Sequence, residues 1–183
     1  MEECEINLRG FEITGSTMEG YVSTGYDSVV SYGLDCDFTM LTTKKMPPEA
    51  IAERYGETGE IKTEKLGDIL VTNYVYDTFT VNFIERDGKL EAAGLLITSP
   101  EAPIAVGGFQ AGSSLDHADN SLRANGYKEK EALSTDMEKY YSGKSLEGDT
   151  CLVILHLKNN IVNKAQGWYG ELADEIIELP SKQ

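Results

Sequence analysis

The sequence predicts an α+β fold made of two tandem units, residues 1–100 and 101–183, each with short helices packed on an antiparallel sheet. Strand-length runs alternate between apolar and polar residues and are joined by tight turns. Short amphipathic stretches begin at capping residues and end near glycine. Similar elements recur in both halves, and the composition of the 183 residues, 40% hydrophobic and 26% charged, is that of a globular protein.

The N-terminal part of the chain gives a mixed prediction. Residues 5–14 alternate in a strand-like manner. Residues 15–33 are rich in glycine and tyrosine, which leaves helix, strand and loop all open. Residues 37–43 are predicted as a strand because apolar side chains such as Phe38 and Met40 alternate with polar ones.

Residues 44–56 are predicted as a short helix. Pro47 and Pro48 fit its first turn, where a missing backbone N–H costs nothing, and Gly56 can end it. A polar connector is expected to follow.

A β-hairpin is the strongest local prediction. Residues 69–76 and 79–84 are β-rich, and the second run alternates as a half-buried strand requires. Asp87-Gly88 then supplies the positive-φ turn that joins this strand to residues 90–97.

The second half begins with a short extended piece at residues 104–106. Residues 112–126 are predicted as a capped amphipathic helix, since Gly-Ser-Ser precedes the apolar positions and Asn-Gly follows them. A further short helix is expected at residues 136–141, with Ser134 or Thr135 as its N-cap.

A second hairpin and a helix complete the chain. Residues 152–157 are predicted as a strand, Asn159-Asn160 as a turn and residues 161–168 as the return strand. Residues 172–179 place apolar side chains on one helical face, and Pro180 ends that helix.

The two halves share an order of elements. Residues 15–19 and 112–116 both open with Gly-Ser, and a short helix ending near Tyr55-Gly56 or Tyr141 follows each. A rival alignment pairs Tyr55-Gly56 with Gly126-Tyr127, so two registers stay open. Chance recurrence of short helices and hairpins is the alternative, because the spacing varies.

The second half carries a family resemblance, through the positions Gly112-Ser113-Ser114-Leu115, Ala118, Leu122 and Gly126. This pattern resembles the small domains of the beta-lactamase-inhibitor-protein type, shared by the outer-membrane lipoproteins called SmpA or OmlA. The resemblance implies tandem helix-plus-sheet units that offer one face to a protein partner and carry out no chemistry. None of the inhibitor's target-contacting residues has a matching motif position here.

Charge limits the partners that the chain is expected to bind. Asp and Glu outnumber Lys and Arg by 31 to 16, and the net charge of −15 disfavours phosphate backbones and anionic membranes. We therefore expect no nucleic acid partner, and no apolar run is long enough for a transmembrane segment. Without a secretory signal at its start the chain is expected to be cytoplasmic; a removed leader would favour the cell envelope or the exterior.

Motifs for catalysis, metals and cofactors are absent from the sequence. The three cysteines show no CxxC spacing, which favours reduced thiols over a zinc site, with one disulfide as the open alternative. Cys151 and His156 should lie on opposite faces of one strand, so they are not expected to form a dyad. For His117, between Asp116 and Asp119, a polar helix face is favoured over a metal site. We predict no catalytic residue, metal or cofactor.

Aromatic residues supply the predicted binding site: Tyr74, Tyr76, Tyr140, Tyr141, Trp168 and Tyr169. Tyrosine and tryptophan are enriched at interface hot spots, although packing in a sheet is the competing role. The pair Tyr74 and Tyr76 should share one face by alternation. The favoured function is non-enzymatic binding of a protein or peptide at a bacterial cell envelope. The alternatives are a small hydrolase that uses acidic residues and an intracellular ligand-binding protein.

Overall fold

A computed structural model describes residues 36–178, so the predictions for residues 5–14 and 15–33 lie outside the described part of the chain. The strands are β1 (Cys36–Asp37), β2 (Glu60–Leu66), β3 (Ile69–Val75), β4 (Phe79–Arg86), β5 (Lys89–Ile97), β6 (Ile104–Ala105), β7 (Lys128–Glu129), β8 (Glu138–Lys144), β9 (Thr150–Lys158) and β10 (Ile161–Tyr169). The helices are α2 (Phe38–Thr43), α3 (Pro48–Tyr55), α4 (Leu115–Ala124) and α5 (Glu171–Glu178).

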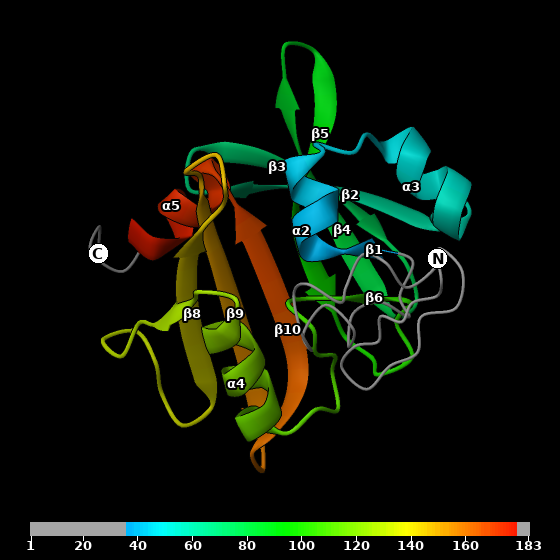
Figure 1. Ribbon diagram of the computed structural model, residues 1–183. Helices are drawn as coiled ribbons and strands as arrows, with labels where there is room; N and C mark the ends of the chain where they lie inside the picture. Colours follow the sequence, from blue (N-terminus) through cyan, green and yellow to red (C-terminus); the bar gives the residue numbers. More distant parts are fainter. Residues whose placement is uncertain (1–35, 179–183) are drawn as a thin grey trace, which may run out of the picture.

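Eight of the strands form one antiparallel sheet in the order β2-β3-β4-β5-β10-β9-β8-β7 (Figure 1). The strands of the two halves meet at its centre, where β5 pairs with β10 and Gly94 lies opposite Trp168. A separate parallel pair joins β1 to β6. The expected α+β class and antiparallel sheet are confirmed, and the strands of both halves join in a single sheet.

Two tight turns connect paired strands of this sheet. Asp87 and Gly88 have φ of 50° and 76°, and Asn159 and Asn160 have φ of 55° and 60°. Two successive positive φ values define the type I′ turn, whose twist matches that of an antiparallel pair. Both predicted hairpins, β4–β5 and β9–β10, are therefore confirmed.

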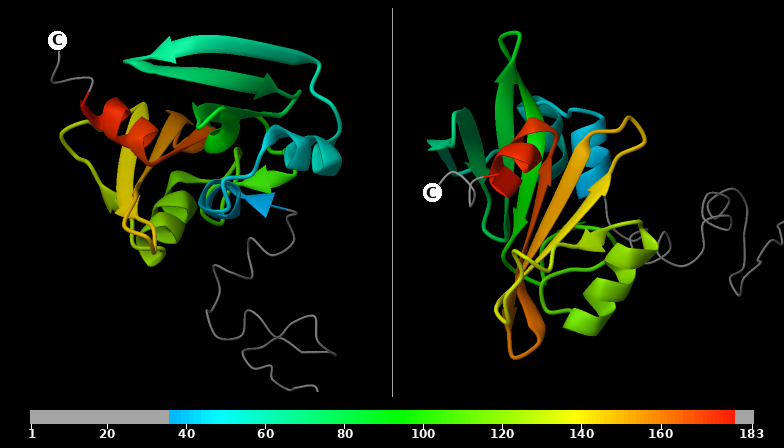
Figure 2. Two further views of the ribbon diagram at one scale, coloured as in Figure 1. Left: turned by 90° about the horizontal axis from the view of Figure 1, so that it is seen from above. Right: turned by 90° about the vertical axis from the view of Figure 1, so that its left-hand side faces the viewer.

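Helices cover both faces of the sheet, as Figure 2 shows. On one face a large apolar cluster includes Phe38 and Leu41 of α2, Ile51 of α3 and Leu122 of α4. On the other face a smaller cluster packs under α5. The helix predicted at residues 112–126 is confirmed as α4, where the Ser114 hydroxyl accepts a hydrogen bond from the His117 N–H.

The strand predicted at residues 37–43 is wrong: after Asp37 the chain forms α2. Phe38 and Leu41 are three residues apart, and both are fully buried on one side of this helix. Phe38 lies over Gly167, where an added Cβ would come within 2.6 Å of the ring. The spacing of three between Phe38 and Leu41 therefore decides the structure, and the apparent alternation of apolar and polar residues does not. A helix is favoured because Gly167 in β10 has no side chain and leaves room for the Phe38 ring.

Two further predictions are wrong. Residues 136–141 form no helix, because Thr135 closes a turn onto Glu138 and β8 then pairs with β9. The polar connector after Gly56 contains β2, which pairs with β3 along its whole length. Both strands carry many polar residues because each lies at or near an edge of the sheet, where side chains remain in solvent.

Candidate interaction surface

The hairpin β2–β3 exposes apolar side chains at one margin of the sheet. Ile61 is 56% exposed and Leu70 is 60% exposed. Ile61 lies opposite Tyr74 and Leu70 opposite Lys65, so the apolar pair and Tyr74 share one face. Tyr74 and Tyr76 are half-buried and pack against the large cluster. We call the face formed by Ile61, Leu70, Tyr74 and Tyr76 the aromatic face.

Neighbouring rings hold the two tyrosines in place. Tyr76 stacks on Phe79 with the ring centroids 4.6 Å apart, and its hydroxyl donates to the Gly56 carbonyl at 3.0 Å. Tyr74 meets Phe83 edge to face at 4.9 Å. Burial, and after it the Glu57 carboxylate, raises the pKa of Tyr76. The ring contacts hold both tyrosines in place while each side chain retains partial exposure.

The other four predicted binding residues lie away from the aromatic face. Tyr140 is half-buried on the opposite face of the sheet, beside the cluster that contains Trp168. Tyr141, Trp168 and Tyr169 are 1%, 7% and 8% exposed. The structure thus brings Tyr74 and Tyr76 together and spreads the remaining aromatics over both faces; a binding role for any of the six stays a prediction.

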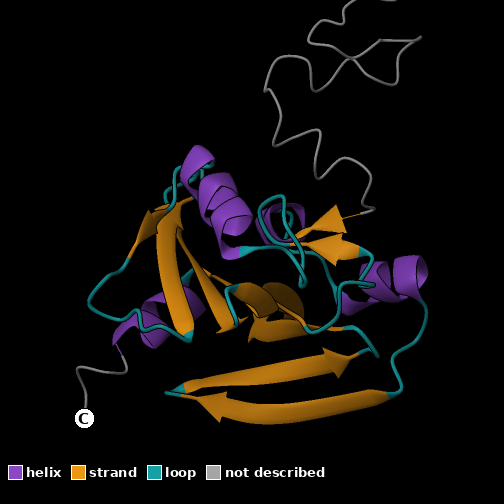
Figure 3. Cartoon of the chain, turned by 90° about the horizontal axis from the view of Figure 1, so that it is seen from below, coloured by secondary structure: helices purple, strands orange, loops and turns teal. Residues whose placement is uncertain are grey.

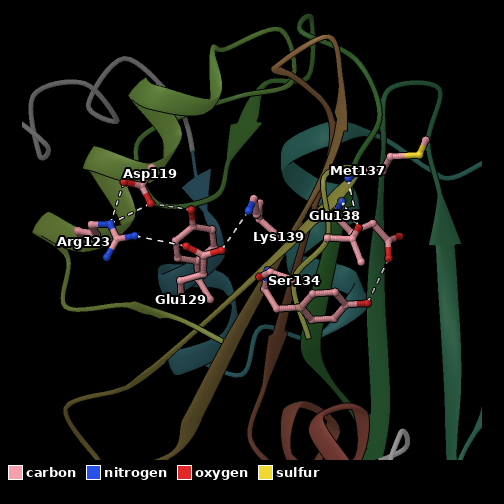
Figure 4. Close-up of polar contacts among 10 residues, drawn as sticks. Asp119, Arg123, Glu129, Ser134, Met137, Glu138 and Lys139 are labelled. Atoms are coloured by element: carbon pink, nitrogen blue, oxygen red, sulfur yellow. Dashed lines mark hydrogen bonds and ion pairs between the residues drawn. The ribbon is translucent and has the colours of Figure 1, made fainter. Parts of the chain in front are cut away.

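Tyr141 belongs to a polar network that ties α4 to β8 (Figure 4). Its hydroxyl donates to Asp119 Oδ1 at 2.6 Å, and Arg123 Nε lies 2.9 and 2.7 Å from the two oxygens of that carboxylate. Glu129 accepts from Arg123 at 3.4 Å and pairs with Lys139 at 3.3 Å. Hydrogen bonding to Arg123 is the largest influence that lowers the pKa of Asp119, whereas burial raises the pKa of Tyr141. These contacts account for Tyr141 as a structural residue.

The Asp119→Asn variant should be less stable than the wild type at neutral pH by about 1–2 kcal/mol. The carboxylate has a lower pKa in the folded protein than in the unfolded chain. Its stabilisation is therefore present above the unfolded pKa, near 3.9, and is lost as the pH falls through the folded pKa. Urea unfolding of both proteins from pH 7 to pH 3 tests this expectation, and a difference that does not shrink on acidification would contradict it.

His156 in β9 contacts side chains of both neighbouring strands. His156 Nδ1 lies 2.8 Å from Glu138 Oε1 in β8, and Nε2 lies 2.9 Å from Gln166 Oε1 in β10. Cys151 lies on the opposite face, as alternation predicts, and burial raises the pKa of its thiol. Within residues 36–178, no three His, Cys, Asp or Glu side chains gather closely enough to hold a metal ion.

A polar cavity of about 370 Å³ lies where the β8–β9 loop meets α2 and α5. Lys144 Nζ donates to Thr150 Oγ1 at 3.0 Å, and that hydroxyl donates to Asp174 Oδ1 at 2.6 Å. Burial and the Asp149 carboxylate, which accepts from the Tyr169 hydroxyl at 2.7 Å, raise the pKa of Tyr169 to about 12. Sequence reasoning missed this cavity because its lining comes from several segments with no common spacing.

Together the fold and these sites define a small α+β protein with one eight-stranded antiparallel sheet, whose β2–β3 margin carries exposed aliphatic side chains and half-buried tyrosines. No protein family and no curated protein matches the sequence. Similar solved structures include a cysteine-rich secretory protein from Staphylococcus aureus, with 9% identity and a TM-score of 0.38 over 68% of this chain and 44% of that chain. The chain thus spans less than half the length of that protein. Within residues 36–178, no helix has the length and apolar character needed to cross a membrane.

Proposed function

We propose that the protein is a non-enzymatic binding module that holds another protein or a peptide on the aromatic face of β2–β3. The observation that carries the proposal is the exposure of Ile61 and Leu70, 56% and 60%, on the same face as two half-buried tyrosines. Ile61 lies opposite Tyr74, and Leu70 lies further along β3, opposite Lys65. Large apolar side chains that remain in water beside fixed aromatic rings are typical of interaction sites. The rings are already held by Phe79 and Phe83, so a ligand would meet a surface that loses little conformational entropy on binding.

A duplicated scaffold is part of the same proposal. In each half a helix precedes four antiparallel strands: α3 before β2–β5, and α4 before β7–β10. The strand order is mirrored about the β5–β10 pair. This arrangement supports two related units divided near residue 100. The resemblance to the beta-lactamase-inhibitor-protein type and a place at a bacterial cell envelope are further parts of the proposal.

Substitution of Tyr74 tests the binding proposal. Peptides selected by display against the full chain would be titrated into wild-type protein and into Tyr74→Ala, with affinity measured by calorimetry. We expect Tyr74→Ala to bind at least about tenfold more weakly, because truncation of an interface aromatic typically costs more than about 1 kcal/mol.

Tyr140→Ala is the matched control for this experiment. Tyr140 is also half-buried in a strand, but it lies on the opposite face of the sheet. The control should keep wild-type affinity. Selected peptides that bind both variants as tightly as the wild type would place recognition elsewhere and remove support for the aromatic face.

A further inference from the structure

The two edges of the eight-stranded sheet differ in how they are protected. At one end β7 has only two residues, and the chain that follows it folds over β8. There the Lys130 N–H donates to the Tyr140 carbonyl at 2.7 Å, and the Tyr140 N–H donates to Ser134 Oγ at 3.1 Å. At the other end β2 is outermost for seven residues, nearly all exposed. No described strand lies along its outer edge in Figure 3, and α5 contacts the strand from one face, where Leu66 packs against the smaller cluster. An open edge of this length is a template for pairing with another strand.

The backbone groups at this edge follow from the register. The Tyr76 N–H donates to the Phe79 carbonyl, and hydrogen-bonded pairs alternate along antiparallel strands. Tyr74 and Thr72 therefore bond to β4, whereas their neighbours in β3 bond to residues 60, 62 and 64 of β2. The N–H and C=O groups of residues 61, 63 and 65 consequently point outward from the sheet.

We propose that β2 pairs with the β2 strand of a second copy of this chain, antiparallel, about a two-fold axis through Thr63. In this register Lys62 lies opposite the partner's Glu64, and by symmetry the contact occurs twice. Thr63 meets its own counterpart through two backbone hydrogen bonds. Residues 62 and 64 form the pairs without backbone hydrogen bonds, in which facing side chains come closest. All seven residues of the strand are paired.

Charge selects this register over its neighbours. Facing residues in an antiparallel pair share a face, so a symmetric pairing can slip only by moving its centre to the next residue. A centre at residue 62 places Lys62 against Lys62 and Glu60 against the partner's Glu64. A centre at residue 64 places Glu64 against Glu64. Like charges directly opposite are destabilising, so of these three registers the one centred on Thr63 is favoured. It also pairs more residues of the strand than a centre at residue 61, which would place Glu60 against the partner's Lys62.

The alternation of Lys62 and Glu64 explains why the charged residues of β2 do not prevent pairing with a second copy. Exposed lysines protect an edge strand because an incoming strand seldom neutralises them. Here the incoming copy presents a glutamate to each Lys62. A two-fold axis perpendicular to the sheet would also place both aromatic faces on the same side, while the pairing itself uses only the edge of β2 and does not depend on peptide binding.

Charge exchange tests the pairing. The mass of the full chain would be measured by sedimentation equilibrium over a wide concentration range for wild type, Lys62→Glu, Glu64→Lys and the double variant. We expect a wild-type dimer, a dissociation constant raised about tenfold or more in each single variant, and recovery in the double variant, in which opposite charges face each other again. Circular dichroism checks folding, since Glu64 also accepts a hydrogen bond from Asn73.

Thr63→Pro provides a second test that does not rest on charge. The Thr63 N–H points outward, so proline should leave the β2–β3 pair intact and abolish the dimer, as edge positions tolerate proline. Thr63→Ala keeps the N–H and should still dimerise. A wild-type chain that is monomeric at every concentration, or a dimer that Thr63→Pro leaves unchanged, would overturn the proposal. Loss of peptide binding in Tyr74→Ala leaves the dimer intact, so the two proposals fail separately.

Discussion

Tyr141→Ala is expected to lower the free energy of unfolding by about 3–5 kcal/mol, the range for removal of a large aromatic side chain from a core. The ring is 1% exposed within the large cluster, so its removal leaves a cavity under α4. The variant also loses the 2.6 Å hydrogen bond to Asp119, which links β8 to α4. Urea unfolding followed by circular dichroism measures the loss.

Two further variants test the cause of this loss in stability. Tyr141→Phe keeps the ring and removes only the hydroxyl, and Asp119 retains Arg123 as a partner. Its loss should be about 1–2 kcal/mol. Tyr140→Ala, the neighbour in β8, is half-buried and should lose less than half as much as Tyr141→Ala. Equal losses at positions 140 and 141 would contradict the assignment of Tyr141 to the core.

The features predicted correctly from the sequence are those decided by neighbouring residues. The turns at Asp87-Gly88 and Asn159-Asn160 depend on residues that accept positive φ, and both occur in the structure. The Ser114 cap depends on one hydroxyl and the N–H of His117 three residues on, and it is present too. Such interactions need no knowledge of the rest of the fold.

The features that were missed depend on partners distant in the sequence. Residues 38–43 form a helix because the Phe38 ring packs against the backbone of Gly167, some 130 residues later. β8 forms because β9 offers it a complete ladder of partners, from Glu138 opposite His156 to Lys144 opposite Thr150. Local propensity contains no information about either partner, so tertiary contacts determine the structure of these two segments.

The candidate site shows the same division. Alternation correctly predicted that Tyr74 and Tyr76 share a face, since period-two geometry is local. It could not distinguish these half-buried rings from Tyr141, which lies under α4, or from Trp168, which lies against Gly94. Exposure depends on which helix packs over each strand, and no sequence pattern carried that information.

Gly94→Val should lower the free energy of unfolding by about 2–3 kcal/mol through overpacking at the centre of the sheet. A Cβ added at Gly94 would lie 2.7 Å from Trp168 Cε3 and 2.9 Å from Asn82 Oδ1. Both neighbours are themselves buried, at 7% and 5% exposure, so neither can move aside freely. Gly59→Val is the matched control: nothing lies within 4 Å of its added Cβ, and the stability change should stay within about 0.5 kcal/mol.

A double variant identifies Trp168 as the cause of the Gly94→Val defect. Trp168→Leu alone opens a cavity beside Gly94, and the valine side chain can then occupy part of that space. The losses of the combined Gly94→Val and Trp168→Leu variant should therefore fall short of the sum of the single losses by about 1 kcal/mol or more. Strictly additive losses would show that the valine does not meet the indole ring, and that the close approach of β5 and β10 at this position is not what requires glycine.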